Sequence, residues 1–577
     1  MRIFILVCAC ALTLAAGAAQ RPNVLLIIAD DQGYGDLSLH GNPNLRTPHL
    51  DRLATNGIQF DRFFVSPLCA PTRASLLTGR YSLRTGARGV ARGEETMCSE
   101  EVTIAELLHG AGYRNGYFGK WHNGETFPYT PNGQGFDDVF GFNLGHWNNY
   151  FDTTFKRNGK PEKTHGFTTD VLTDEALKFI ESNQARPFFC YVAYNVPHSP
   201  FQCPDKYFDP HKRAGLNDFL ASVYGMVENM DDNIGRLLAK LDDLKLRENT
   251  IVIFMSDNGP NGARYNVGMR GVKGTYHEGG SRVPCFISWP AKFKQPRIVR
   301  EMAAHIDILP TLTELCGVVN TSTSALDGRS LVPLLEGRTN GWTDRILFQQ
   351  HLANARADRT GSLRTQRFRL VNDGNGWQLF DMRLDPEQKR NASAEFPDEK
   401  RKLVSAYEKW WSGIKAELIT PWPPPIPVGY AHENPVELPV PQADFSGGLR
   451  FSGKHPNNAW LTNWTNTSAH VEWKIDVAQP GDYEARLLYL TSEADAGAKV
   501  RVQVGEKSVE ATTRTTPVIQ VPSPDRVPRE EVYEMQWHEL RVGTISLQTG
   551  TNTLSVRALT KPGPEVMQLK SVLLQRR

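Results

Sequence analysis

The sequence lacks any long run of charges of one sign, and after its first twenty residues it lacks an apolar run of membrane-spanning length. Its 65 Lys and Arg residues balance 63 Asp and Glu residues, which gives a formal net charge of +2. A nucleic-acid-binding protein usually carries a concentrated basic patch, and a transmembrane helix needs about 20 apolar residues. The composition therefore argues against a nucleic-acid partner and against a transmembrane segment, although a small anion can still be bound locally.

Cysteine is also scarce, with eight residues in 577, and no CxxC pair or His/Cys cluster has the spacing of a zinc site. Cys8 and Cys10 belong to the first twenty residues. Cys190 and Cys203 flank a loop, and two interpretations of them stay open: a disulfide, or two buried free thiols.

The chain begins with MRIFILVCACALTLAAGAAQ, in which one arginine precedes an apolar stretch that ends in small residues. This pattern is typical of a secretory signal peptide, and we predict one over residues 1–19. The mature protein is therefore expected to be exported. It would be periplasmic or secreted in a bacterium, and lysosomal or extracellular in a eukaryote.

The length exceeds what one hydrophobic core usually supports, so several domains are expected. Changes in pattern along the chain predict a catalytic domain over residues 20–345 and a smaller subdomain over 346–418. A proline-rich segment over 419–440 predicts an extended linker draped over a surface. An all-β sandwich is expected over 441–577.

Short apolar runs in the first part of the chain predict buried strands, and polar residues follow each of them. The runs are residues 23–29, 113–118, 187–194 and 250–255. Helical patterns such as 102–108 and 219–241 lie between them, so we predict an α/β fold with a doubly wound, mostly parallel sheet. Functional sites in such sheets form at the carboxyl ends of the strands.

Two of these runs end in oxygen-bearing side chains, Asp30 and Asp31 after the first and Asp257 and Asn258 after the last. Each pair alone is also a good turn sequence after a strand. Together they are hard oxygen donors without a thiolate or imidazole, which favours Ca²⁺ and, less strongly, Mg²⁺.

The segment 69–73 (CAPTR) places a cysteine at the start of a predicted helix, one turn before Arg73. Free backbone N–H groups and the positive end of the helix dipole gather anions there. Cys69 is therefore a candidate nucleophile facing a tetrahedral oxyanion. The alternative is a buried structural cysteine.

The pattern Cys-x-Pro-x-Arg followed by residues 74–80 (ASLLTGR) resembles the signature of the type I sulfatases of the alkaline phosphatase superfamily. The resemblance implies that a separate formylglycine-generating or anaerobic sulfatase-maturating enzyme oxidises Cys69 to Cα-formylglycine. Hydration of the formylglycine aldehyde would give two hydroxyls on one carbon. One of them would attack sulfur, and the other would later drive the release of sulfate. The implied metal ligands are Asp30, Asp31, Asp257, Asn258 and an oxygen of modified Cys69.

Three further blocks also resemble this family, in the expected order: 119–122 (GKWH), 195–200 (NVPHSP) and 273–284 (KGTYHEGGSRVP). The resemblance implies that positive side chains offset the charge of the sulfate and of the leaving oxygen. These are Arg73, Lys120 and Lys273. His122 would take a proton from the formylglycine hydroxyl, and His198 with Lys273 would protonate the departing alcohol.

Among the remaining histidines, His40, His49 and His277 receive no catalytic role. His146 is a hypothetical substrate contact, which an unchanged Michaelis constant in His146→Ala would exclude.

After the catalytic part, residues 362–385 predict short strands and 398–415 predict a helix, which resembles the small C-terminal subdomain of the family. Beyond the proline-rich segment, alternating patterns predict strands of a sandwich. They cover residues 469–477, 481–490, 498–504 and 552–558.

Aromatic residues make this sandwich look like the carbohydrate-binding domains of polysaccharide-active enzymes, although aromatics in such domains more often form the core. They are Trp460, Trp464, Trp473 and Tyr489. In strand alternation, Trp473 is expected in the core.

The sequence thus predicts an exported sulfatase acting on a sulfated carbohydrate. One alternative is a phosphonate monoester hydrolase or phosphodiesterase using the same formylglycine site. A second alternative is a catalytically inactive carbohydrate-binding protein with a sulfatase fold.

Overall fold

The computed structural model describes residues 21–351 and 360–577, so the predicted signal peptide lies outside the described residues. Within these ranges, no helix is both long enough and apolar enough to cross a membrane. The six described cysteines are free, which resolves the open question about Cys190 and Cys203 in favour of two buried thiols.

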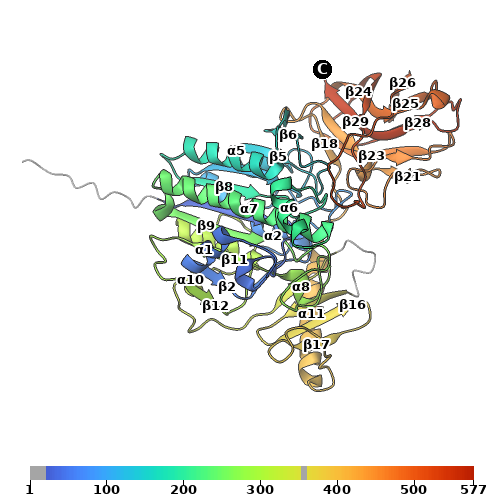
Figure 1. Ribbon diagram of the computed structural model, residues 1–577. Helices are drawn as coiled ribbons and strands as arrows, with labels where there is room; N and C mark the ends of the chain where they lie inside the picture. Colours follow the sequence, from blue (N-terminus) through green and yellow to red (C-terminus); the bar gives the residue numbers. More distant parts are fainter. Residues whose placement is uncertain (1–20, 352–359) are drawn as a thin grey trace, which may run out of the picture.

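The catalytic part contains a ten-stranded sheet whose centre is parallel, as predicted (Figure 1). Strands β9, β1, β8, β4 and β5 run in one direction, whereas β11, β6 and β7 are antiparallel to their neighbours. In the order of the sheet the strands are β12 (Arg297–Val299), β2 (Ile58–Phe60), β11 (Cys285–Ser288), β9 (Thr250–Ser256), β1 (Asn23–Ala29), β8 (Phe188–Ala193), β4 (Arg114–Lys120), β5 (Asp138–Phe142), β6 (Thr154–Arg157) and β7 (Lys160–Lys163).

Helices cover both faces of this sheet, which is why its central strands are apolar on both sides. Leu25 and Ile27 pack on one face with helices α1 (Pro48–Asn56), α5 (Thr168–Ser182) and α7 (Asp218–Asp243). Leu26 packs on the other face with α2 (Cys69–Thr78), α4 (Ile104–Gly110), α9 (Ile308–Cys316) and α10 (Val332–Leu335). Shorter elements complete this part: α3 (Ser82–Thr85), α6 (Asp205–Arg213), α8 (Glu278–Ser281), and a small sheet of β10 (Arg282–Val283), β3 (Phe63–Phe64) and β13 (Ala303–Ala304).

A four-stranded antiparallel sheet with one long helix follows, and Figure 1 shows it below the main sheet. Its elements are β14 (Leu347–Gln349), β15 (Thr360–Arg364), β16 (Phe368–Asp373), β17 (Gln378–Asp381) and α11 (Pro397–Glu417). Leu403, Tyr407 and Ile414 lie on the helix face that packs against the strands. The strands and the helix predicted for this region are confirmed.

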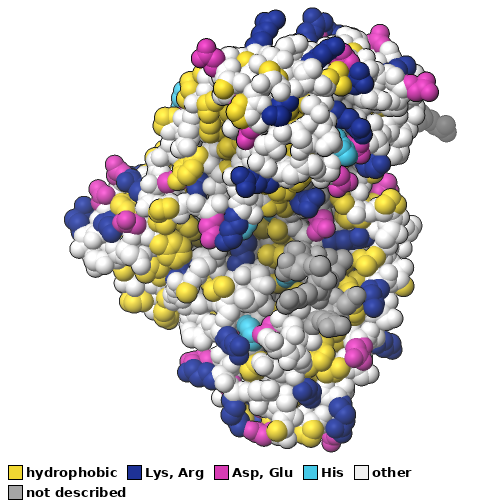
Figure 2. Space-filling model, turned by 90° about the vertical axis from the view of Figure 1, so that its right-hand side faces the viewer, with side chains coloured by type: hydrophobic (Ala, Val, Ile, Leu, Met, Phe, Trp, Pro, Cys, Tyr) yellow, Lys and Arg dark blue, Asp and Glu magenta, His cyan; other side chains and the backbone are white. Residues whose placement is uncertain are grey.

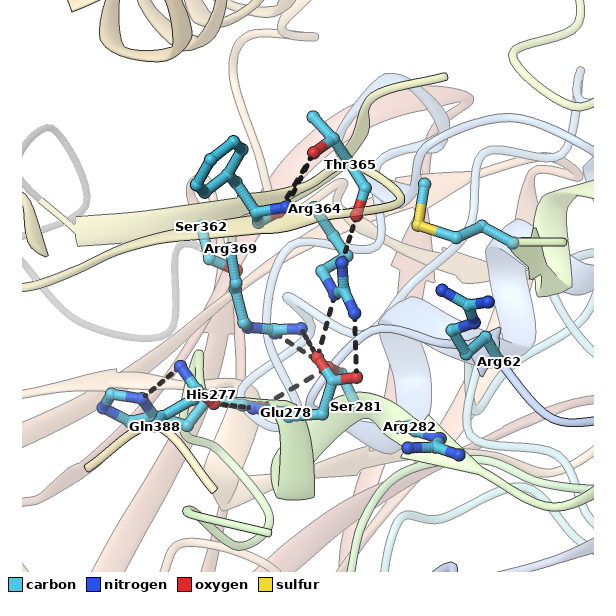
Figure 3. Close-up of polar contacts among 12 residues, drawn as sticks. Arg62, His277, Glu278, Ser281, Arg282, Ser362, Arg364, Thr365, Arg369 and Gln388 are labelled. Atoms are coloured by element: carbon cyan, nitrogen blue, oxygen red, sulfur yellow. Dashed lines mark hydrogen bonds and ion pairs between the residues drawn. The ribbon is translucent and has the colours of Figure 1, made fainter. Parts of the chain in front are cut away.

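A buried ion cluster joins this subdomain to the catalytic part (Figure 3). Glu278 of α8 accepts hydrogen bonds from Arg364 Nε at 3.1 Å and from Arg369 Nη1 at 3.0 Å. Burial raises the pKa of Glu278, but the two guanidinium groups outweigh burial and lower it to about 2. Gln388 accepts a hydrogen bond from the Glu278 amide at 2.7 Å and contacts His277 Nδ1 at 3.2 Å. Residues of the subdomain therefore hold the segment 273–284 in place through Glu278 and His277.

The C-terminal part is a sandwich of two sheets around one apolar core, drawn in orange and red in Figure 1. One sheet contains β18 (Ile426–Val428), β23 (His470–Val477), β28 (Gly550–Ala558), β25 (Lys499–Val504) and β26 (Lys507–Thr512), with β20 (Asp444–Phe445) on β23. The other contains β21 (Arg450–Phe451), β22 (Leu461–Thr462), β29 (Gln568–Arg576), β24 (Gly481–Leu490) and β27 (His538–Leu547), with β19 (Val436–Pro439) on β29.

Two segments of the predicted linker over 419–440 are strands of the sandwich, and there the prediction is wrong. Strand β18 pairs with β23, and β19 pairs with β29, so both belong to the sandwich. Prolines are tolerated there because these short strands lie at sheet edges, where fewer N–H donors are needed. Trp473 and Trp464 are buried in the core, as is Tyr489, so these rings do not form an exposed sugar platform.

Candidate active site

Polar side chains meet at the carboxyl ends of four neighbouring parallel strands, as the sequence predicts. Asp30 follows β1, Asp257 follows β9, His122 follows β4 and His198 lies in the loop after β8. In Figure 2 the surface is hollowed between the upper and the lower lobe, and Lys and Arg side chains lie around the hollow.

The predicted metal ligands lie together. Potential ligand atoms of Asp30, Cys69 and Asp257 are all within 4.8 Å of one another, and the same holds for Asp30, Asp31 and His198. Asn258 is tied to this cluster because its Nδ2 donates to Asp31 Oδ1 at 2.7 Å. Three buried oxygens have no hydrogen-bond partner among the described residues: Asp30 Oδ1, Asp31 Oδ2 and Asn258 Oδ1. Buried oxygens are seldom left without a partner, so this donor set fits a hard divalent cation.

The charges of the cluster also fit a cation. Burial raises the pKa of Asp257 well above its usual value, and Asp30 raises it further, against the opposing effect of Arg73. For Asp30 and Asp31, burial is outweighed by the nearby Lys and His side chains, chiefly Lys120 and Lys273, and both pKa values are lowered. The neighbouring cations thus lower the pKa of Asp30 and Asp31 but not that of Asp257, and a divalent cation would supply the further positive charge that favours the ionised form of all three.

Each predicted cation contacts a carboxylate of the cluster, and Arg73 contacts two, since its Nη2 also lies 3.8 Å from Asp30 Oδ2. Lys120 Nζ lies 2.5 Å from Asp30 Oδ2, and Lys273 Nζ lies 2.6 Å from Asp31 Oδ1. Arg73 donates to Asp257 Oδ2 from Nε at 3.1 Å and from Nη2 at 2.8 Å, and its Nη1 donates to the Lys120 carbonyl at 2.7 Å. The Arg73 side chain is 1% exposed and that of Lys273 is 16% exposed. Arg73 thus positions a carboxylate, whereas Lys273 faces the accessible side.

Cys69 is the first residue of α2, at the predicted helix entry, and is 2% exposed. The preceding residue, Leu68, is extended and forms no side-chain cap, so no N-cap side chain occupies the free N–H groups of the first turn. Asn123 fixes this turn by donating to the Ala70 carbonyl at 2.9 Å. The thiol therefore lies beside both the helix N-terminus and the carboxylates.

His122 is held in one orientation. Its Nε2 donates to the Val90 carbonyl at 3.0 Å, and its Nδ1 is buried without a hydrogen-bond partner among the described residues. Burial, followed by the charge of Lys120, lowers the pKa of His122 to about 3. Gly145 is needed for this arrangement, because a Cβ there would lie 2.2 Å from Nε2. His122 therefore presents an unprotonated Nδ1, which is the form of a general base.

His198 donates its structural hydrogen bond from Nδ1, whereas His122 donates from Nε2. Its Nδ1 donates to the Ser199 carbonyl at 2.6 Å, which leaves Nε2 facing Asp31 Oδ2 at 3.9 Å. Burial, followed by Lys273, lowers its pKa. Nine of the ten predicted site residues are joined by these contacts, and His122 lies two residues after Lys120 at the end of β4.

The sequence interpretation missed a contribution from the sandwich. Ser199 Oγ donates to Glu531 Oε1 at 2.8 Å, and the same carboxylate oxygen lies 3.8 Å from His146 Nδ1. Glu531 follows a proline-rich stretch without a periodic pattern, and no motif spacing connects it to the catalytic blocks. His146 itself is buried, with its ring centroid 5.9 Å from that of His198, and a substrate contact through it stays a prediction.

Two family models match the chain: Sulfatase over residues 22–318, and N-sulphoglucosamine sulphohydrolase, C-terminal, over 272–409. The chain is 32% identical over 409 residues to N-acetylgalactosamine-6-sulfatase of Canis lupus familiaris, an alignment that covers 64% of this chain and 76% of that protein. It is 34% identical over 371 residues to human arylsulfatase A, with coverage of 56% and 70%.

Among solved structures, Ps i-CgsB in complex with k-i-k-neocarrahexaose is similar, with a TM-score of 0.65 and 30% sequence identity. That similarity covers 70% of this chain and 94% of the solved chain. The family models end before the sandwich, which is thus an addition to the matched region. With its matched regions spanning both the parallel sheet and the small subdomain, the chain belongs to the sulfatase family and is a sulfuric ester hydrolase.

Proposed function

We propose that this hydrolase acts on sulfate esters of a carbohydrate through a formylglycine derived from Cys69. The observation that carries the proposal is the position of Cys69, at the N-terminus of α2 and within 4.8 Å of the Asp30 and Asp257 ligand atoms. Carbohydrate as the substrate class is supported by the relatives, because one is named for N-acetylgalactosamine and another was solved with an oligosaccharide.

The proposed metal is Ca²⁺, held by Asp30, Asp31, Asp257, Asn258 and an oxygen of the modified residue 69. Several protein oxygens at one point suit Ca²⁺ better than Mg²⁺, which usually keeps more of its water ligands. The ion would supply positive charge to the sulfate oxygens. The hydrated formylglycine would supply the hydroxyl that attacks sulfur.

The remaining roles belong to side chains of the chain itself. Lys273 keeps its proton, because the nearby carboxylates outweigh burial and raise its pKa. It is therefore suited to stabilise and protonate the departing alcohol together with His198, which faces the same side. His122 would accept the proton of the formylglycine hydroxyl at Nδ1 when sulfate is released. Lys120 stays against Asp30 and adds positive charge beneath the sulfate.

Function in the cell requires two further steps that we include in the proposal. The chain is exported through the predicted signal peptide over residues 1–19, and a formylglycine-generating or anaerobic sulfatase-maturating enzyme acts on Cys69.

A panel of sulfated saccharides tests the substrate class. Protein produced together with a maturation enzyme is assayed for released sulfate, with an aryl sulfate and an aryl phosphodiester as paired references. We expect sulfate release from the aryl sulfate and from at least one saccharide, and much weaker phosphodiester cleavage. A preference for the phosphodiester would instead establish the phosphodiesterase alternative, and the absence of any saccharide cleavage would refute the carbohydrate assignment.

A further inference from the structure

The sandwich reaches the active site through the loop over residues 513–537, which connects β26 to β27. The loop folds back on itself, since Val521 N donates to the Glu534 carbonyl at 2.8 Å and Gln536 N donates to the Ile519 carbonyl at 2.9 Å. Its far end leaves the sandwich and lies against the segments after β5 and β8 of the catalytic part.

Buried polar contacts anchor this loop to the catalytic part. Arg529 and Asp525 form an ion pair at 2.5 Å, with side chains only 1% and 8% exposed. Gln202 Nε2 donates to Asp525 Oδ1 at 2.7 Å, and Arg529 Nη1 donates to the Asn148 carbonyl at 2.9 Å. Such a paired and hydrogen-bonded set fixes the position of the neighbouring residues.

Glu531 follows this anchor by two residues and faces Ser199 and His146. Ser199 donates to its Oε1 at 2.8 Å, and His146 Nδ1 lies 3.8 Å from the same oxygen. Its side chain is 17% exposed, comparable with 16% for Lys273 and 10% for His198. Glu531 therefore lies on the accessible side of the site, next to the group proposed to protonate the leaving alcohol.

The ionised state of Glu531 agrees with its surroundings. Burial raises its pKa, but His146, His198 and the Ser199 hydroxyl outweigh burial and lower it. An acidic side chain at this place is unexpected for a site that binds an anion, because it repels any further negative charge on the substrate.

We propose that Glu531 is a specificity-determining residue, contributed by the sandwich, that accepts a hydrogen bond from a free hydroxyl of the sugar beside the sulfate ester. The same carboxylate would disfavour a second sulfate at that place by like-charge repulsion. This assignment rests on the proposed carbohydrate substrate. It gives the sandwich a role in forming the substrate site rather than in binding a distant glycan.

The test compares Glu531→Gln with Glu530→Gln in the full, matured chain. Gln keeps the size of the side chain and an oxygen for Ser199 but removes the charge. Glu530 is the matched control, since it lies on the same loop, is exposed and pairs with Lys454 at the surface. The substrates are a monosulfated saccharide with a neighbouring free hydroxyl, its disulfated congener and an aryl sulfate.

For Glu531→Gln, we expect the ratio of kcat/KM for the monosulfated saccharide to that for the aryl sulfate to fall about 10-fold, chiefly through KM. The preference for the monosulfated over the disulfated saccharide should fall by a similar factor. Glu531→Asp keeps the charge but shortens the side chain, so the saccharide-to-aryl-sulfate ratio should fall as in Glu531→Gln, whereas the preference for the monosulfated over the disulfated saccharide should stay as in wild type. Glu530→Gln should match wild type, and thermal unfolding of each variant verifies that it is folded.

Unchanged ratios in folded Glu531→Gln and Glu531→Asp would overturn the assignment of Glu531 while leaving the carbohydrate substrate intact. If the wild type cleaves the aryl sulfate but no saccharide, the proposed substrate class fails, and the role of Glu531 fails with it.

Discussion

At the scale of single residues, the candidate site is a set of paired opposite charges. Lys120, Lys273 and Arg73 each contact at least one of the three carboxylates, so the positive side chains determine where the proposed metal ligands point. Arg73 differs from the two lysines because its guanidinium is fully buried and holds both Asp257 and a backbone carbonyl. We therefore propose that Arg73 positions a metal ligand, whereas the sequence interpretation assigned it only to offsetting the charge of the sulfate and of the leaving oxygen.

Replacing Arg73 should weaken metal binding. Arg73→Met leaves the buried Asp257 without its partner, and breaking a buried ion pair from one side costs about 3–5 kcal/mol. We expect lower stability without metal and a smaller rise in Tm on adding Ca²⁺ than in wild type, measured by calorimetry after removal of metal with a chelator. A wild-type Ca²⁺ response in Arg73→Met would contradict the positioning role.

The residue scale also shows what the sequence could predict. Asp30, Asp31 and Asp257 directly follow apolar strand runs, so the parallel sheet alone brings them to one edge. The pairing of Arg73 with Asp257 could not be predicted, because both partners are charged and several other pairings satisfy the same spacing. Glu531 could not be predicted either, since only the packing of a loop from another domain brings it to the site.

At the scale of elements, the block from Lys273 to Arg282 depends on the subdomain that packs on it. Glu278 of α8 binds Arg364 of β15 and Arg369 of β16, and the three side chains are buried (Figure 3). The sequence indicated the strands and the helix of this subdomain because their periodicity is local. The ion cluster could not be predicted in this way, because it joins residues almost a hundred positions apart and no local sequence pattern marks it.

Removal of the Glu278 charge should destabilise the packing of the subdomain on the catalytic part. In Glu278→Gln, two buried arginines lose their counter-charge, so the free energy of unfolding should fall by about 3–5 kcal/mol. The half-buried Glu510→Gln, which removes a partner of Lys499 and Arg501 at the surface of the sandwich, should have little effect. Chemical denaturation of both variants measures the difference, and equal stabilities would contradict the account.

The lowered pKa of Glu278 also predicts how the free energy of unfolding depends on pH. The pKa of Glu278 is lowered from 4.5 to about 2 in the folded protein, so its stabilisation is present above about pH 4.5 and is lost as the pH falls toward 2. Wild type should therefore lose stability over this window more steeply than Glu278→Gln. Parallel curves between pH 5 and pH 2 would be inconsistent with the lowered pKa.

At the scale of the whole molecule, the sandwich is integrated with the catalytic part rather than tethered to it. The prolines around residues 421–441 suggested an extended linker because proline disfavours both helices and central strands. Edge positions accept them, and Val428, Val436 and Leu438 are buried in the sandwich core. Composition alone cannot distinguish a linker from an edge strand, since the difference lies in distant partners.

Two truncations test where the sandwich begins. A chain ending at residue 440 keeps β18 and β19 without their partners β23 and β29, so apolar edge strands are exposed and aggregation is expected. A chain ending at residue 418 lacks both strands and should be the more soluble of the two. Size-exclusion chromatography compares them, and a monomeric chain to 440 beside an aggregated chain to 418 would support the linker instead.

The central claim is that the catalytic group is made from Cys69, and the fraction of converted Cys69 tests it most directly. Preparations with different amounts of maturation enzyme are analysed by mass spectrometry of the peptide containing Cys69, and sulfate release is measured on the same samples. We predict activity proportional to the converted fraction, near zero without conversion and in Cys69→Ala. Full activity in protein that retains an unmodified Cys69 thiol would contradict it.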